Sequence, residues 1–291
     1  LKVMVSFCLA ILILALERGN AKELGRGTAT FVECFSALVS LISIDFISTR
    51  TLSSIFFGVM GIFSQDYSNM PGIEAGVRMT SILENPNVFA GCVGIGVILS
   101  LGLVNSSSHP YARRFHTACL ALSSLGFLLA FSMGASGVIA IAFLVYLFLE
   151  SGKKRSTLLV LMVETLICTL AAAFPIYLTS FDAWTGMRPI PLLAAVCAAA
   201  ALCLIDHFVG EKIAFWLGER PKAAPILLVG VLAVCGVYAV LALNVTGGIT
   251  LSAGESLRRS AYPEPGSYAL TVQADQELQV TIESQNQQDT M

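Results

Sequence analysis

The sequence predicts an all-α polytopic membrane protein of about eight transmembrane helices, followed by a short β-rich extracytoplasmic segment. The composition is the first observation behind this prediction. Of the 291 residues, 56% are hydrophobic and 12% are charged, and the mean hydropathy is +0.79, whereas soluble proteins carry about 25% charged residues. Apolar runs of membrane-spanning length also recur along the chain, and Lys and Arg gather in alternate loops. The net charge of −2 gives no indication of a nucleic-acid partner.

The expected spans divide residues 1–245, which we take as one transmembrane domain. A helix that crosses a bilayer needs about 20 mostly apolar residues. The runs that approach this length lie near residues 1–16, 28–48, 87–104, 117–132, 136–150, 157–178, 190–208 and 223–245. The run 117–150 is too long for one span, and small residues interrupt it at 132–137, which predicts a tight helical hairpin. The apolar residues 53–63 are too few to cross, so we expect a half-helix, an interfacial segment or a continuation of the preceding span.

The Lys and Arg residues of the short loops predict the orientation of the spans. Eleven of them lie in one set of alternate loops and three in the other. The richer set, which we expect in the cytoplasm, consists of loops 17–27, 105–116, 151–156 and 209–222. The outward set consists of loop 49–86, the hairpin tip, loop 179–189 and the tail after residue 245. A single span at 117–150 would break this alternation, so the charges also favour the hairpin.

The tail, residues 246–291, is predicted to be a second, β-rich domain. Apolar and polar residues alternate in YALTV (268–272) and LQVTI (278–282), and the polar QADQE joins them. This pattern indicates a β-hairpin, which is only marginally stable by itself. We therefore expect it to belong to a larger outward module, and we expect the protein to continue beyond Met291.

One outward stretch, RMTSILENPNVFAG (residues 78–91), holds the most informative polar residues. Asn85 is a favourable N-cap and Pro86 suits the first helical position, so capping alone explains part of the pattern. The guanidinium of Arg78 can hold a phosphate with its planar fork, and the helix start adds partial positive charge. Arg78, Asn85 and Asn87 therefore have two interpretations: a capped helix entrance beside a solvated arginine, or a diphosphate site.

A second stretch extends this pattern. Together with RMTSILENPNVFAG, the sequence LLAFSMGASGVIAIAFLVYLF (128–148) resembles two motifs of the O-antigen ligase and O-antigen polymerase superfamily: an arginine followed by Asn-Pro-Asn, and a helix, Ser-Arg-Gly-Ala turn and helix. The spacing between the two stretches is also similar. The resemblance covers residues 50–150, and the other spans are similar in hydropathy alone.

The resemblance implies a membrane glycosyltransferase of cell envelope polysaccharide biosynthesis. Such enzymes lie in the bacterial cytoplasmic (inner) membrane. They transfer a glycan from an undecaprenyl-diphosphate carrier to a glycan or lipid acceptor on its outer face, or polymerise such glycans. The implied reaction is inverting and needs neither metal nor cofactor: an acceptor hydroxyl attacks the anomeric carbon, and arginines stabilise the departing diphosphate. Ligase and polymerase share these motifs, so the sequence leaves both open.

Two departures from the family pattern concern the reacting groups. Met133 stands where the family's turn often has an arginine. In the ligases a histidine of the large outer loop is implicated as the base, yet His109 and His116 fall in an expected cytoplasmic loop and His207 near the cytoplasmic end of a span. We expect His109 and His116 to be solvated. The catalytic residue is therefore unassigned, and we expect the base beyond Met291.

Further outward arginines complete the set of candidate substrate-binding residues. Arg188 shares a loop with Asp182 and Trp184, and this loop either touches sugar and phosphate or is, as we favour, a solvated connector with an interfacial Trp. Arg258 and Arg259 either meet a diphosphate or lipid headgroups or, as we favour, are surface charge. The candidate substrate-binding residues are Arg78, Asn85, Asn87, Arg188 and Arg258.

Residues within the spans allow an alternative function. Glu164 lies inside the span 157–178 and is either protonated or paired with Lys153 or Lys154. It is the main feature in favour of a multi-pass transporter or flippase of an envelope precursor, the alternative to the glycosyltransferase. The eight cysteines all lie in apolar segments without CxxC spacing, so we expect small packed side chains rather than disulfides or metal ligands.

Overall fold

The structure, a computed structural model, describes part of the chain. The described residues are 21–61, 73–74, 78–79, 83, 85–180, 187–220, 227–231, 233–234 and 236–237. The chain divides into two units, Leu1–Arg259 and Ser260–Met291. The second unit, and with it the hairpin predicted in the tail, lies outside the described residues, as does the expected first span at 1–16.

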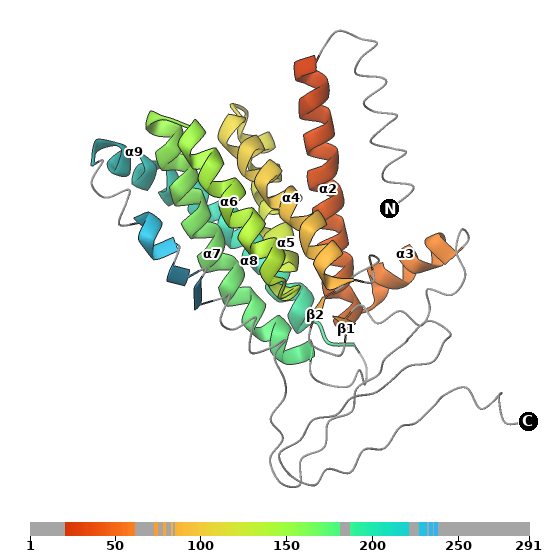
Figure 1. Ribbon diagram of the computed structural model, residues 1–291. Coiled ribbons are helices and arrows are strands. Elements are labelled where there is room, and N and C mark those ends of the chain that lie inside the picture. The colour runs from red at the N-terminus through yellow and green to blue at the C-terminus, as the bar shows by residue number, and fades with distance from the viewer. Residues whose placement is uncertain are drawn as a thin grey trace, which may run out of the picture. The chain divides into compact units, whose positions relative to one another are not determined.

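The described residues are almost entirely helical (Figure 1). Two short strands, β1 (Ile73–Glu74) and β2 (Arg78–Met79), pair antiparallel between helices α3 and α4. The helices are α2 (Ala21–Ile47), α3 (Thr51–Gly61), α4 (Pro86–Ser106), α5 (Pro110–Leu129), α6 (Met133–Leu149), α7 (Gly152–Ser180), α8 (Ile190–Ile205), the π-helical turn η3 (Asp206–Gly210) and α9 (Glu211–Glu219).

The chain is a membrane protein, as its composition predicts. Within the part of the chain that the structure describes, four helical segments are long and apolar enough to cross a bilayer: Glu23–Ile47, Pro86–Ser106, Gly152–Thr179 and Ile190–Gly218. The shorter helix α6 is apolar as well, and it exposes Val138, Ile141 and Phe148. An apolar helix face of this kind is stable against lipid and unfavourable against water.

Several helices are longer than the apolar runs from which they were predicted. Helix α5 begins at Pro110, where proline suits the first helical position, so Arg113 and Arg114 belong to its first turns rather than to a loop. Helix α7 likewise begins at Gly152, five residues before the predicted span. The predicted span 190–208 continues through η3 to Glu219, because one π-helical turn carries the helix past Asp206 without ending it. Hydropathy marks the part of a helix that lies in lipid, and charged turns extend beyond it.

The helical hairpin predicted within 117–150 is present, but its turn lies earlier than the small residues suggested. Helix α5 ends at Leu129, and Phe131 takes a positive φ of 46° before α6 begins at Met133. Residues 133–137 are therefore the first turns of α6. The segment predicted to be too short to cross forms the separate 11-residue helix α3.

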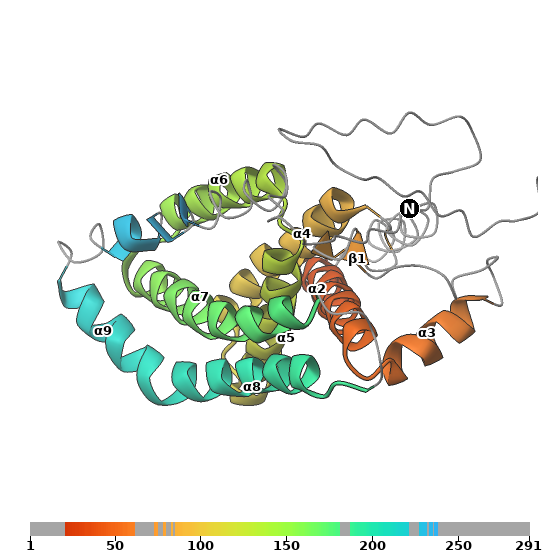
Figure 2. The ribbon, with the colours of Figure 1, turned by 90° about the horizontal axis from the view of Figure 1, so that it is seen from below.

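Viewed along the helices, α4 and α5 occupy the centre of the bundle (Figure 2). Helix α2 packs against both of them, while α7 packs against α5, α8 and α9. Serines of α2 face glycines of its neighbours: Ser36 lies against Gly96 of α4, and Ser40 lies against Gly126 of α5. Small residues at these crossings let the helix backbones approach closely, which is how membrane helices gain packing energy.

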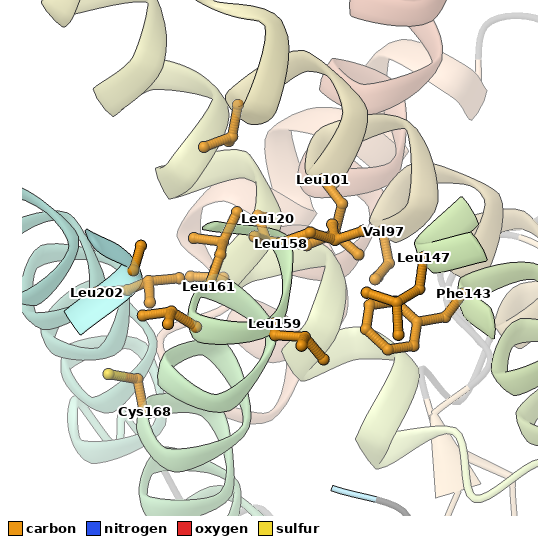
Figure 3. Packing of buried hydrophobic residues seen from close by; sticks show 14 of the residues in the cluster. Val97, Leu101, Leu120, Phe143, Leu147, Leu158, Leu159, Leu161, Cys168 and Leu202 are labelled. Carbon is orange, nitrogen blue, oxygen red and sulfur yellow. The ribbon is translucent and has the colours of Figure 1, made fainter. Parts of the chain in front are cut away.

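Two apolar clusters fill the spaces between the helices. One lies where α2 and α5 end and contains Ile47, Met79, Phe89 and Ala130. The other joins α4, α5, α7 and α8 through Leu101, Leu120, Leu158, Leu161 and Leu202 (Figure 3). The first cluster supports the end of the bundle at which the sequence motifs lie.

Candidate functional site

Both motif stretches begin at one end of the bundle, which we call the motif end. Helices α2, α5 and α7 finish there and α4, α6 and α8 begin there, with β1, β2 and α3 beside them (Figure 1). The described parts of loops 49–86 and 179–189 lie with the hairpin tip at this end, as the alternation of the predicted spans requires.

Asn85 performs the capping role that the sequence predicts. Its backbone is extended (φ −117°, ψ 122°), and its Oδ1 accepts hydrogen bonds from the backbone N–H groups of Asn87 (2.9 Å) and Val88 (3.3 Å). Pro86 takes the first helical position, where no N–H is needed. The oxygen of Asn85 is therefore engaged in starting α4.

Asn87 joins the first motif to the second. The hydroxyl of Ser132 donates a hydrogen bond of 2.9 Å to Asn87 Oδ1, across 45 residues of sequence. Ser132 is also the N-cap of α6, since its Oγ accepts from the backbone N–H of Ala135 at 3.4 Å. The hydroxyl of Ser136 in turn donates to the carbonyl of Ser132 at 2.7 Å. The starts of α4 and α6 are thus held together through one serine.

The backbone of Arg78 lies beside this helix entrance. Arg78 pairs with Glu74 in the short sheet, and Met79 pairs with Ile73. The side chain of Met79 is 2% exposed and belongs to the apolar cluster of Phe89 and Ala130. Strand β2 accordingly lies against α4 and α5. Nothing described fixes the direction of the guanidinium, so its role stays a prediction.

Arg188 comes to the same end through its backbone. Its N–H donates to the carbonyl of Ser48 at 3.0 Å, and the Ser48 hydroxyl donates back to the carbonyl of Arg188. The same hydroxyl oxygen accepts from the N–H of Leu192 at 3.3 Å. Ser48 therefore joins the start of α8 to the end of α2.

The half-buried Arg188 side chain lies at the motif end, whereas Arg258, Asp182 and Trp184 lie outside the described residues.

Asp45 and Arg50 form a polar corner that sequence reasoning missed. Asp45 is fully buried and accepts hydrogen bonds from the Thr49 hydroxyl and from the backbone N–H (2.7 Å) and hydroxyl (2.9 Å) of Ser53. Arg50 has a positive φ of 56°, and its guanidinium lies over the ring of Phe46 with Nε donating to the Phe46 carbonyl at 3.0 Å. Burial lowers the pKa of Arg50, which stays charged at neutral pH. An aspartate close to the end of an apolar run was the available signal.

The opposite half of the bundle contains a second polar group. Asp206 of η3 accepts two hydrogen bonds from the Arg113 guanidinium, that from Nε at 2.8 Å. His116, one turn further along α5, is buried and lies 2.6 Å from Glu33 of α2 through its Nδ1. The expectation of a solvated His116 is therefore wrong, because α5 starts early enough to carry it inside the bundle. His109, the N-cap residue of α5, remains at the exposed turn.

Glu164 is buried beside this group. Its side chain lies within electrostatic range of Asp206 and Arg113, and among the described residues neither carboxylate oxygen has a hydrogen-bond partner. Lys153 and Lys154 are exposed on the first turn of α7. Of the two alternatives for Glu164, pairing with Lys153 or Lys154 is thus not what the structure contains. None of the six cysteines that are described forms a disulfide.

The motif end combines groups suited to holding an anion or a sugar. It contains the start of α4 and the guanidinium-bearing residues Arg50 and Arg188. Asp45, its buried carboxylate, accepts three hydrogen bonds. Over the described ranges, no group of three or more His, Cys, Asp and Glu residues is arranged to bind a metal ion. No protein-family model, curated protein or solved structure matches the chain.

Proposed function

We propose that the chain is a multi-pass glycosyltransferase of the bacterial cytoplasmic membrane, of the O-antigen ligase and polymerase type. It transfers a glycan from a polyprenyl-diphosphate carrier to an acceptor on the outer face, or polymerises such glycans. The proposal includes eight transmembrane spans, with the motif end and the β-rich tail outside the cytoplasm.

The observation that carries this proposal is the hydrogen bond between Ser132 and Asn87. The two stretches that resemble the family belong to different helices, and this bond makes them one surface. If the two stretches resembled the family only by chance, there would be no reason for the first residues of α4 and α6 to be in contact. The backbone positions of Arg78 and Arg188 at the same end add cationic residues for a diphosphate.

The proposed chemistry is electrostatic. An acceptor hydroxyl attacks the anomeric carbon of the carrier-linked sugar, the glycosidic C–O bond to the diphosphate breaks, and the diphosphate leaves with the bonding electrons. Arg78, with Arg188, would stabilise the negative charge that develops on the leaving oxygen, and the partial positive charge at the start of α4 would favour the bound anion. No described residue at the motif end is assigned as the base.

The test replaces Arg78 by Ala and measures glycan joined to acceptor against glycan left on the carrier lipid. Removing one group that stabilises a developing oxyanion costs about 10²–10³ in rate, so glycan should accumulate on the carrier at an unchanged protein level. Arg114→Ala is the matched control, because Arg114 is an exposed arginine of α5 far from the motif end. Unchanged transfer in Arg78→Ala would refute the assignment. So would labelling of a cysteine at position 78 from the cytoplasmic side alone.

A transporter or flippase is the second candidate, and the burial of Glu164 favours it. Ionisable residues inside membrane helices often mark the path of an ion or substrate. This function predicts that Glu164→Gln abolishes solute or precursor transport while Arg78→Ala is tolerated. The opposite pattern would favour the glycosyltransferase.

A further inference from the structure

Among the described residues, five ionisable side chains lie between α2, α5, α7 and η3, four of them buried and Arg113 half-buried, and their charges do not balance. Three are carboxylates, on Glu33, Glu164 and Asp206, which are 0%, 6% and 5% exposed. The possible cations are Arg113 and His116, both on α5. Each is already joined to one carboxylate: His116 to Glu33, and Arg113 to Asp206 through two hydrogen bonds. Glu164 is the carboxylate left over.

The side chain of Glu164 lies against Gly210, the last residue of the π-helical turn. A Cβ on Gly210 would lie 2.9 and 3.1 Å from the two carboxylate oxygens of Glu164 and 3.3 Å from Asp206 Oδ1. Both carboxylates therefore reach the same small space, which exists because residue 210 has no side chain. π-Helical turns within α-helices occur frequently at functional sites.

No cation that the structure describes forms an ion pair with Glu164. On η3 the neighbour is Asp206, a like charge, and on α5 it is Arg113, whose two hydrogen bonds go to Asp206. Glu211 at the start of α9 also acts on Arg113, so this guanidinium serves several carboxylates. On α7 itself, Cys168 lies one turn away from Glu164. A second negative charge buried among these membrane helices would be strongly unfavourable.

We infer that Glu164, Asp206 and Gly210 form a proton-binding site within the membrane helices, in which Glu164 holds the proton. As a carboxylic acid, Glu164 adds no charge and fits the apolar environment of α7. Arg113 then balances Asp206 one to one. The site belongs to neither the motif end nor the proposed glycosyl transfer, so it stands or falls independently of that function.

Reaction with dicyclohexylcarbodiimide, an apolar reagent that attacks protonated carboxyl groups, tests the inference on the purified full chain. At neutral pH the reagent should label Glu164, located by peptide mass spectrometry, and labelling should fall as the pH rises. Glu164→Gln should lose this label, and the exposed Glu219 serves as the internal control. In Arg113→Gln the charge of Asp206 is no longer balanced, so a second label should appear on Asp206.

Infrared difference spectroscopy of wild type against Glu164→Gln gives a readout that does not depend on reagent access. A carbonyl stretch of a protonated carboxylic acid that is lost in Glu164→Gln supports the proton site. A carboxylate band in its place at neutral pH overturns it. Protection of Glu164 from the reagent by Na⁺ at constant pH would also overturn it, because the site would then hold an ionised carboxylate and a metal cation.

Discussion

The packing of α2 on α4 makes a quantitative prediction for Gly96. A Cβ at this position would overlap both Cβ and Oγ of Ser36, which is fully buried. Ser36 cannot avoid the contact by rotating its side chain, because the Cβ is fixed by the helix and its hydroxyl is bonded to the carbonyls of Val32 (2.8 Å) and Cys92 (3.3 Å). Gly96→Ala must therefore push α2 and α4 apart.

The size of the effect follows from two opposing contributions. Overpacking a well-filled site costs about 1–3 kcal/mol, and replacing glycine by alanine inside a helix gains up to about 1 kcal/mol. The free energy of unfolding should thus fall by about 1–2 kcal/mol in Gly96→Ala. Gly91→Ala is the matched control on the same helix, because no atom lies within 4 Å of its added Cβ. That variant should be as stable as the wild type, or more stable by up to about 1 kcal/mol.

Equilibrium unfolding by SDS in mixed micelles measures both variants. The double variant Ser36→Gly/Gly96→Ala places the glycine on α2 instead of α4. It should recover part of the lost free energy of unfolding. A double-mutant cycle would report this recovery as favourable coupling between the two positions. If Gly96→Ala proved as stable as Gly91→Ala, the close approach of α2 and α4 would be wrong.

Three further predictions concern polar contacts, and the same unfolding measurement checks them. Asn85→Ala should lower the free energy of unfolding by about 1 kcal/mol through loss of the α4 cap, whereas Asn85→Ser should retain most of it; equal losses in the two variants would contradict the capping role. Arg113→Ala should destabilise by about 3–5 kcal/mol because Asp206 stays buried without its partner. The double variant Arg113→Ala/Asp206→Ala should be more stable than this single variant, and additive losses would argue against the ion pair. Ser132→Ala and Asn87→Ala should show a coupling of about 0.5–1.5 kcal/mol, as expected for one hydrogen bond, and strict additivity would show that the two motifs do not touch.

Much of the helical organisation could be predicted because hydropathy reports directly on lipid exposure. The hairpin after α5 and the separate α3 followed from where apolar runs are interrupted or too short. The turn lies earlier than predicted because most of the small residues at 132–137 continue as helix, whereas the chain reverses at Phe131 through a positive φ. Glycine is tolerated in membrane helices, where it allows close packing.

Side-chain partners were much harder to predict than spans. Asn85 was correctly assigned as a cap because capping is a local interaction that spacing reveals. The pairing of His116 with Glu33 joins residues on different helices, and no spacing rule reports which helix faces share a buried layer. Asp45 was overlooked for a related reason: its partners Thr49 and Ser53 look like ordinary loop residues until the break between α2 and α3 brings them together.

The serine and glycine contacts of α2 bear on how the protein is made. Ser36 lies against Gly96, and Ser40 lies against Gly126, so the surfaces of α2, α4 and α5 fit together closely. These helices leave the ribosome before α7 and α8, since chains are synthesised from the N-terminus. An early three-helix intermediate can therefore form at the insertion machinery, and the later helices can assemble on a template that is already rigid.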